Sequence, residues 1–400
     1  MPSSSGWVSC RPEDDAERFS ERSDERRQLF EDASRRLPTA SLSPLLWAFF
    51  QVGDVESLQE LCVNKASWNN VFNELYESGF GKKAKDAIRL WRQAGPEKDT
   101  TLIPSKRSAS TAFGRPTTLS PASRLQATSP ADPSRTRPPT PRSGTIAKQC
   151  KQRDRVCVVS RQGALEACHI FPHCAFGGGD SNKRVADFWS ILRWFWSPDK
   201  VDSWRAKIFR NDTTSMFVGV ETIENMLTLT ETLHRFHTEG AFALRPIRMS
   251  DDKTQLELEF HWLVRQQRDS AERVDLMEQP LSSRDLSYSR RELIACRFDD
   301  VTKPTLLVSG TRFTMTTEDP IKLPLPDPGL LEMQWHLQRV MAMSGAAGWR
   351  EEDFDYEDPE EEDSIRSVEQ WLDDQSDNPD SQSRGRSPGD SVEIVDREHS

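Results

Sequence analysis

Apolar residues recur at three- and four-residue steps through the first quarter of the chain, which is the spacing of helices that bury one face. The pattern stops at Pro38, resumes after the Ser-Pro pair at 43–44 and breaks again at the Gly-Asp pair at 53–54, and these residue types begin and end helices. The spacing therefore predicts a helical region over residues 24–94. Its clearest apolar members are Leu29, Phe30, Ala33, Trp47, Phe49, Phe50, Leu58, Phe72, Ala84, Ile88 and Trp91.

Two short runs near the middle of the chain have the β-branched and apolar residues of strands. Val156–Val159 and Leu165–Phe171 flank the turn sequence Ser-Arg-Gln-Gly, so they predict a β-hairpin. An aromatic helical face over residues 185–196 predicts a scaffold helix behind it. Farther on, Thr230 is suited to cap a helix and Glu231 to its first turn, so a short helix is expected there.

Alternating apolar and polar positions predict further strands toward the C-terminus. Asp251-Asp252-Lys253 is a turn sequence between two such segments, so we expect them to pair, and Gly310 predicts a second hairpin. With a final amphipathic helix, this central domain spans residues 148–345. The predicted strands are 241–247, 255–264, 305–308 and 312–316, and the predicted helix is 330–343.

Three stretches are too poor in apolar residues to bury a core. Residues 1–23 are polar, residues 95–147 are rich in proline, serine and threonine with an excess of base, and residues 346–400 are strongly acidic. A segment that buries little apolar surface does not offset the entropy lost on ordering, so we predict that all three are disordered. The formal net charge of -11 comes largely from the acidic tail, so it does not exclude a nucleic-acid partner. The tail itself is a candidate contact for a protein partner.

Cysteine usage and hydropathy place the chain in a reducing compartment. The seven cysteines are odd in number and widely spread, so they do not form a disulfide framework. The N-terminus lacks the basic and apolar regions of a secretory signal, and no apolar run approaches the roughly 20 residues of a membrane helix. We therefore expect an intracellular protein, nuclear or cytoplasmic, with no membrane partner.

The residues with the clearest chemical potential are two histidines and an asparagine. His169 lies near the end of the second strand of the predicted hairpin and is followed by Ile-Phe-Pro. Asn225 lies some fifty residues later, and His234 follows nine positions on, within the predicted helix. We expect the two imidazoles to converge on one phosphate-sized gap, braced by the carboxamide.

This order resembles the HNH endonucleases, and the flanks resemble the HNH domains found in many fungal proteins. The residues that carry the resemblance are Cys-His-Ile-Phe-Pro at 168–172, Asp187-Phe-Trp with Trp194 and Trp196, Asn225, His234, and Gly-Ala-Phe-Ala-Leu-Arg-Pro-Ile from Gly240. Pro-Leu-Pro at 324–326 and Gln334-Trp335 continue it, so the resemblance covers about residues 150–345. It implies an α+β fold with a ββα-metal core, to which further strands and helices are added.

The resemblance also implies residue roles and partners. Hydrolysis of a DNA phosphodiester requires an activated water and stabilisation of the charge on the departing oxygen. His169 takes the place of the general base, Asn225 that of an organiser, and His234 that of a ligand to a divalent metal, which is Mg²⁺, Mn²⁺ or Zn²⁺. An imidazole suits the first role because its ordinary pKa leaves it neutral near pH 7.

Cys168 departs from the family pattern, in which many members have Asp or His as a second metal ligand directly before the base. A thiolate binds Zn²⁺ well and Mg²⁺ poorly. Cys168 therefore makes the site thiophilic, leaves the metal to His234 and a carboxylate such as Glu166 or Asp180, or marks lost activity. In the last case the chain is an inactive HNH scaffold that binds nucleic acid or protein. A structural zinc at Cys157, Cys168, His173 and Cys174 is a further alternative.

Overall fold

The structure of the 400-residue chain is a computed structural model. It describes residues 6–9, 14–36, 41–64, 79–92, 143–176, 181–209, 219–289, 293–300 and 302–349. These lie in one compact unit within Met1–Tyr356. The predicted linker as far as residue 142, the predicted tail beyond residue 349, the helix expected around Phe72 and the carboxylate of Asp180 lie outside the described residues. The last residues of the predicted linker, 143–147, and the first of the predicted tail, 346–349, are ordered instead: they contribute to helix α7, Gly144–Asp154, and to the 3-10 turn η3, Ala346–Gly348.

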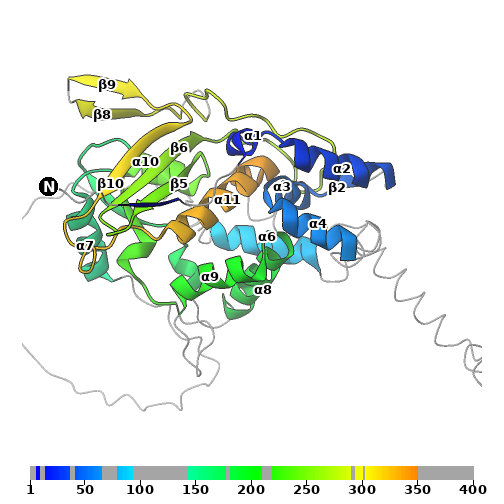
Figure 1. Cartoon of the computed structure of the whole chain (residues 1–400), viewed down its shortest axis with the longest axis horizontal. Helices are drawn as coiled ribbons and strands as arrows, with labels where there is room; N and C mark the ends of the chain where they lie inside the picture. The colour runs from blue at the N-terminus through cyan, green and yellow to red at the C-terminus, as the bar shows by residue number, and fades with distance from the viewer. Residues whose placement is uncertain are drawn as a thin grey trace, which may run out of the picture. The chain divides into compact units, whose positions relative to one another are not determined.

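A four-stranded antiparallel sheet forms one side of this unit (Figure 1). Its strand order is β1-β5-β6-β10, with β1 at Trp7–Ser9, β5 at Phe242–Ser250, β6 at Gln255–Trp262 and β10 at Thr311–Thr316. The expected pairing of the segments on either side of Asp251-Asp252-Lys253 is confirmed, since Leu244 lies opposite Phe260. Turn chemistry and alternation both act locally, which is why this hairpin was predictable from sequence.

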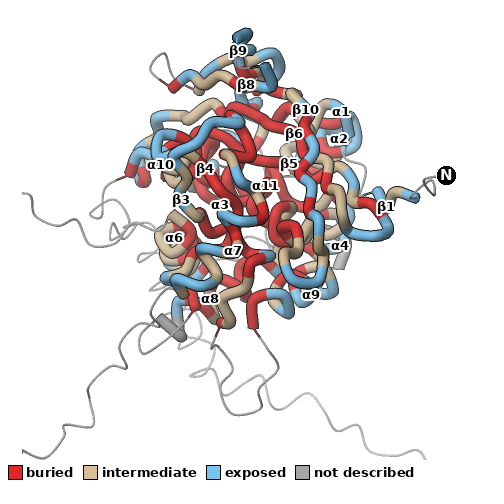
Figure 2. The backbone as a smooth tube through the Cα atoms, turned by 90° about the vertical axis from the view of Figure 1, so that its left-hand side faces the viewer, coloured by how far each residue is buried: buried red, intermediate tan, exposed pale blue. Residues whose placement is uncertain are grey.

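The hairpin predicted about Gly310 is wrong. β10 pairs with β6, and the expected partner segment, β9 at Lys303–Leu306, pairs with β8 at Cys296–Asp300. Burial explains why β10 pairs with β6 and not with β9. Pairing with β6 lets β10 place Phe313 and Met315 in the core, whereas all four residues of β9 are exposed. Figure 2 shows the same contrast between the exposed β9 and the buried β5 and β6.

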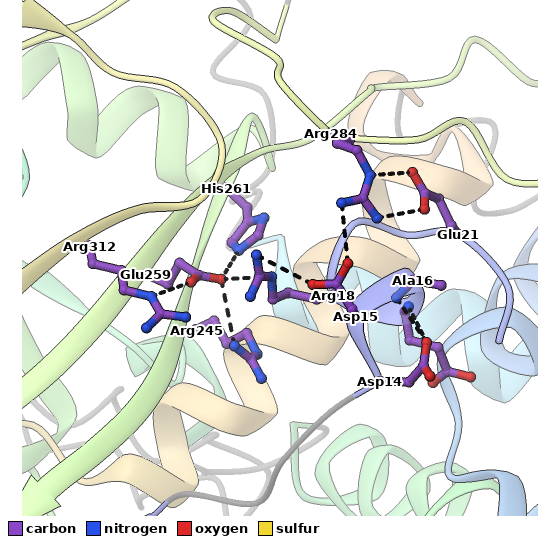
Figure 3. A network of polar contacts seen from close by, with 11 residues as sticks. Asp14, Asp15, Ala16, Arg18, Glu21, Arg245, Glu259, His261, Arg284 and Arg312 are labelled. Carbon is purple, nitrogen blue, oxygen red and sulfur yellow. Dashed lines mark hydrogen bonds and ion pairs between the residues drawn. The ribbon is translucent and has the colours of Figure 1, made fainter.

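Part of the N-terminal segment expected to be disordered is ordered instead. β1 adds to the edge of β5, and the guanidinium of Arg248 lies 4.3 Å from the centre of the Trp7 ring. A short helix follows, α1 at Asp15–Arg18, and Arg18 Nε reaches Glu259 Oε1 on β6 at 3.4 Å (Figure 3). A few aromatic and arginine contacts thus anchor a segment whose composition is polar overall.

The helical region shares its core with the central domain. Ser43 caps α3 by accepting a hydrogen bond from Leu46 N, and proline occupies the first turn as expected. The Phe49 ring of α3 stacks 5.0 Å from Phe195, and α11 lies between α3 and β5 (orange in Figure 1) with fourteen of its seventeen residues buried. The helices here are α2 at Asp24–Arg36, α3 at Pro44–Val52, α4 at Val55–Asn64, α6 at Phe80–Trp91 and α11 at Pro328–Ser344, with the 3-10 turn η3 at Ala346–Gly348; the short strands β2 at Ser41–Leu42 and β7 at Val274–Asp275 pair.

A separate two-stranded sheet carries the candidate chemistry. Strand β3, Leu165–His169, pairs antiparallel with β4, Met226–Thr230, and α10, Glu231–Thr238, follows β4 directly. Helix α7, Gly144–Asp154, packs against both strands. Between the strands the chain forms η1 at His173–Phe176, α8 at Ser181–Phe195, α9 at Pro198–Ile208 and η2 at Ile223–Asn225.

The hairpin predicted between Val156–Val159 and Leu165–Phe171 is therefore wrong in its first strand. Residues 156–164 form tight turns instead, in which Cys157 N donates to Gln162 O at 2.8 Å. The partner of β3 is β4 instead, a strand from much farther along the chain, and all five residues of β4 pair with the five residues of β3. Among the residues that the structure describes, no helix has the length and apolar run that crossing a bilayer requires.

Candidate functional site

The side chains of β3 alternate between two faces of the small sheet, since successive residues of a strand point to opposite sides. Glu166 and Cys168 share one face, and both contact side chains of α10. Ala167 and His169 share the other face, where Ala167 packs against a cluster that includes Cys150 of α7. Helices α10 and α7 thus cover opposite faces of β3 and β4.

On the α7 face, His169 forms a buried pair with Glu221. Its Nε2 lies 2.9 Å from Glu221 Oε1, and the two side chains are 5% and 9% exposed. The second carboxylate oxygen of Glu221 accepts a hydrogen bond from the backbone N–H of Ser143 at 2.6 Å, the residue that caps α7. The ring of His173 lies 5.2 Å from that of His169. This arrangement holds an imidazole in one orientation beside an acceptor-only carboxylate.

Asn225 fixes the turn directly after His169. Its Oδ1 accepts from Phe171 N at 2.7 Å and its Nδ2 donates to Phe171 O at 3.0 Å, while its own carbonyl accepts from Ile170 N at 2.9 Å. The side chain is fully buried. An amide that satisfies both backbone groups of one residue sets the direction in which the chain leaves β3, and with it the position of His169.

On the α10 face, His234 lies beside Glu166. Thr230 caps α10, as the sequence predicts, by accepting from Leu233 N. One turn later His234 Nδ1 lies 2.7 Å from Glu166 Oε2, with the two side chains 27% and 47% exposed. Solvent therefore reaches this imidazole–carboxylate pair.

Cys168, expected beside His234, faces His237 instead. Its Sγ lies 3.5 Å from His237 Nδ1, and both side chains are buried. Burial, with a smaller contribution from the charge of His234, lowers the pKa of His237 to about 3, so this imidazole is neutral at pH 7. The thiol thus occupies a closed apolar position next to a neutral ring.

The predicted convergence of His169 and His234 is not found, because the two rings lie on opposite faces of the sheet. Among the described residues, no group of three or more His, Cys, Asp or Glu side chains is arranged to hold a metal ion. The alternative of a structural zinc is not formed either: Cys157 accepts from Ser160 N, whereas Cys174 lies against Leu90 O on α6.

Glu221 is the residue that sequence reasoning missed. It lies in the segment before η2 and has no helical or strand period around it. It meets His169 because the chain returns from α9 to the edge of β3, a contact between residues 52 positions apart. No local pattern encodes such a contact. Glu166, in contrast, is one of the two carboxylates that the sequence suggested as a companion of His234, and strand alternation places it on the same face as Cys168.

Part of the chain matches a known protein family. Residues 156–245 match the family model described as HNH endonuclease, a range that contains β3, β4, α10 and the first residues of β5. No curated protein and no solved structure matches the chain. The matched range contains His169, Asn225 and His234, and it identifies the chain as a protein with an HNH domain.

Proposed function

We propose that the HNH domain hydrolyses DNA phosphodiester bonds with the aid of a divalent metal, and that His169 is the general base. The observation that carries the proposal is the buried His169–Glu221 pair, located within the range that matches the HNH endonuclease family. A neutral imidazole held by a carboxylate accepts a proton from water near pH 7, and it is stabilised once protonated. Asn225 supports the base by holding the turn after it.

His234 and Glu166 are the residues we assign to the metal. They supply one nitrogen and one carboxylate, and both are reached by solvent, which suits a divalent ion that takes its other ligands from water and phosphate oxygens. A bound metal would supply charge stabilisation for the departing oxygen. We do not assign Cys168 to this role, because its buried thiol faces His237 rather than His234.

A second function is favoured by the placement of the two histidines. His169 and His234 lie on opposite faces of β3 and β4, so a shared reaction centre requires β3 or α10 to move when nucleic acid binds. A scaffold that binds nucleic acid or protein without cleaving it has no such requirement. The closed Cys168–His237 pair agrees with that second function.

Plasmid nicking separates the two functions. We expect the full chain to nick supercoiled DNA with Mg²⁺, Mn²⁺ or Zn²⁺, and His169→Asn to lose about 10²-fold or more of the rate, the range of general-base contributions. Asparagine keeps a polar amide in the buried site beside Glu221, which is a milder change than the apolar side chain of His169→Ala. His173→Asn is the matched control and is expected to cleave at close to the wild-type rate. Equal nicking by wild type and His169→Asn contradicts the proposal.

The same preparations test the second function by gel shift. Wild-type protein that shifts DNA in the presence of each metal, yet leaves the plasmid intact, supports the non-catalytic scaffold. Metal-dependent cleavage that is lost in both His169→Asn and His234→Ala excludes it.

A further inference from the structure

We infer that Glu221 is a positioning residue, which fixes His169 as the Nε2–H tautomer and so makes Nδ1 the nitrogen that accepts the proton. The inference rests on the proposed function for its catalytic consequence, and on the geometry alone for the tautomer. The His169 Nε2 to Glu221 Oε1 distance of 2.9 Å is that of a hydrogen bond.

The chemistry of the two groups decides which nitrogen carries the proton. A carboxylate accepts hydrogen bonds and donates none, so the ring nitrogen that faces it must be the one bearing hydrogen. The opposite tautomer would direct a lone pair at a carboxylate in a site where both side chains are nearly buried. Because leaving a buried charged acceptor without its donor is unfavourable, we expect the Nε2–H tautomer to be preferred by at least about fivefold.

The start of α7 holds the carboxylate in place. Ser143 uses its backbone N–H to bind Glu221 Oε2 at 2.6 Å, while its hydroxyl accepts from Ile146 N as the helix cap. Each carboxylate oxygen therefore has its own donor, one from the helix start and one from the base. The positive end of the helix dipole favours a negative group at this position. Rotation of the Glu221 carboxylate away from His169 would break the contact with α7 as well.

The other glutamate–histidine pair is a built-in control. Glu166 meets His234 through Nδ1, not Nε2, and these side chains are 27% and 47% exposed on the opposite face of the sheet. Solvent can replace that contact, so its loss is expected to leave His169 unaffected. The chain thus offers two isosteric Glu→Gln substitutions, each beside a histidine of the HNH domain.

The tautomer is measured directly on the full chain labelled with ¹⁵N-histidine. Long-range proton–nitrogen spectra distinguish a protonated ring nitrogen from one with a lone pair, and His169→Asn identifies the signals of His169 by their loss. We expect Nε2–H for His169 in the wild type at neutral pH. In Glu221→Gln the new amide can donate to Nε2, so we expect a mixed population or a change to Nδ1–H. Glu166→Gln is expected to leave the His169 signals unchanged.

Cleavage kinetics test the catalytic consequence separately. Glu221→Gln is expected to lower kcat by about 10²-fold or more with KM within a few-fold, because a base in the wrong tautomer is misplaced for proton transfer while DNA binding is retained. Purely structural damage would lower the unfolding midpoint instead of changing the tautomer.

The outcomes are distinguishable from failure of the proposed function. A wild-type ring with hydrogen on Nδ1, or an unchanged Nε2–H tautomer in Glu221→Gln, overturns the inference whether or not the protein cleaves DNA. An altered tautomer with wild-type kcat overturns the positioning role in catalysis. An altered tautomer in a protein that never cleaves DNA retains the geometric assignment and rejects the nuclease.

Discussion

At the scale of single residues, Glu259 on β6 is a buried carboxylate surrounded by positively charged side chains. Its carboxylate is fully buried and is met by His261 Nε2 at 2.7 Å and Arg312 Nε at 2.8 Å (Figure 3). Arg18 and Arg245 approach at 3.4 and 3.5 Å. Burial opposes ionisation, but the hydrogen bonds from His261 and Arg312 and the nearby charges lower the pKa of Glu259 to about 2.

Replacement of the Glu259 carboxylate is expected to lower the free energy of unfolding, and to lower it more at pH 7 than at pH 3. Glu259→Gln removes the buried negative charge that Arg18, Arg245 and Arg312 surround, so we expect a loss of about 3 kcal/mol of unfolding free energy at pH 7. Because the folded pKa lies below the ordinary value of 4.5, the contribution is complete above pH 4.5 and is lost as the pH falls toward 2. At pH 3 the difference between wild type and variant should be smaller by about 2 kcal/mol.

Urea unfolding at pH 7 and pH 3 measures both values. Glu318→Gln is the control, because the carboxylate of Glu318 pairs with Arg155 where both side chains are largely exposed. It is expected to cost less than about 1 kcal/mol at pH 7. A Glu259→Gln loss that is equal at the two pH values contradicts the assigned pKa shift.

At the scale of elements, α10 is held by His237 on its buried side. The ring lies against Cys168 Sγ, and the backbone carbonyl of His237 accepts from Gln338 Nε2 of α11 at 2.9 Å. The pKa of about 3 means that the folded state excludes a proton which the unfolded state binds below 6.5. Folding stability is therefore complete above pH 6.5 and falls as the pH decreases toward 3.

His237→Gln tests whether His237 is neutral in the folded protein. The test uses a pH range above the one in which Glu259 changes the free energy of unfolding. Between pH 6.5 and 5 the wild type is expected to lose about 2 kcal/mol through His237, at about 1.4 kcal/mol per pH unit. The glutamine variant has no titrating group there, so its stability should be flatter across the same window. The comparison is made by urea unfolding at pH 7, 6 and 5, and parallel slopes for the two proteins would reject a neutral buried His237.

Some of these elements could be predicted from the sequence and others could not. The β5–β6 pair, the Thr230 cap of α10 and helix α11 were predictable, because each depends on period, turn or cap residues close together in the chain. The partner of β3 was not, since Val156–Val159 and Met226–Thr230 are both apolar and only tertiary packing selects between them. His169, Asn225 and His234 were singled out from the sequence and lie within the range that matches the HNH family, and their roles stay a prediction. The contact of Glu221 with His169 and the separation of His169 from His234 could not be predicted, because they depend on the packing of segments far apart in the chain.

At the scale of the whole molecule, the N-terminal helices make buried contacts both within the range that matches the HNH family and with residues beyond it. Arg22, just before α2, donates to Leu276 O at 2.8 Å, a contact between residues 254 positions apart, and its Nε donates to Gln51 of α3. Burial lowers the pKa of Arg22 to about 10, which still leaves it charged at pH 7. Phe195 of α8 receives the rings of Phe49 and Phe80 at 5.0 and 5.6 Å.

This shared core predicts that the described parts of residues 24–92 and 143–349 unfold together. If the parts were independent domains, Phe49→Ala would destabilise the helical region alone. With Phe49 packed against Phe195, the cavity affects both parts, and we expect a loss of roughly 3–5 kcal/mol in one transition. Calorimetric and van't Hoff enthalpies should agree for wild type and variant, since coincidence of the two is the test of all-or-none unfolding. Two resolved transitions, with only the first shifted by Phe49→Ala, would instead make the helical region a separate domain that the HNH domain does not need for its own folding.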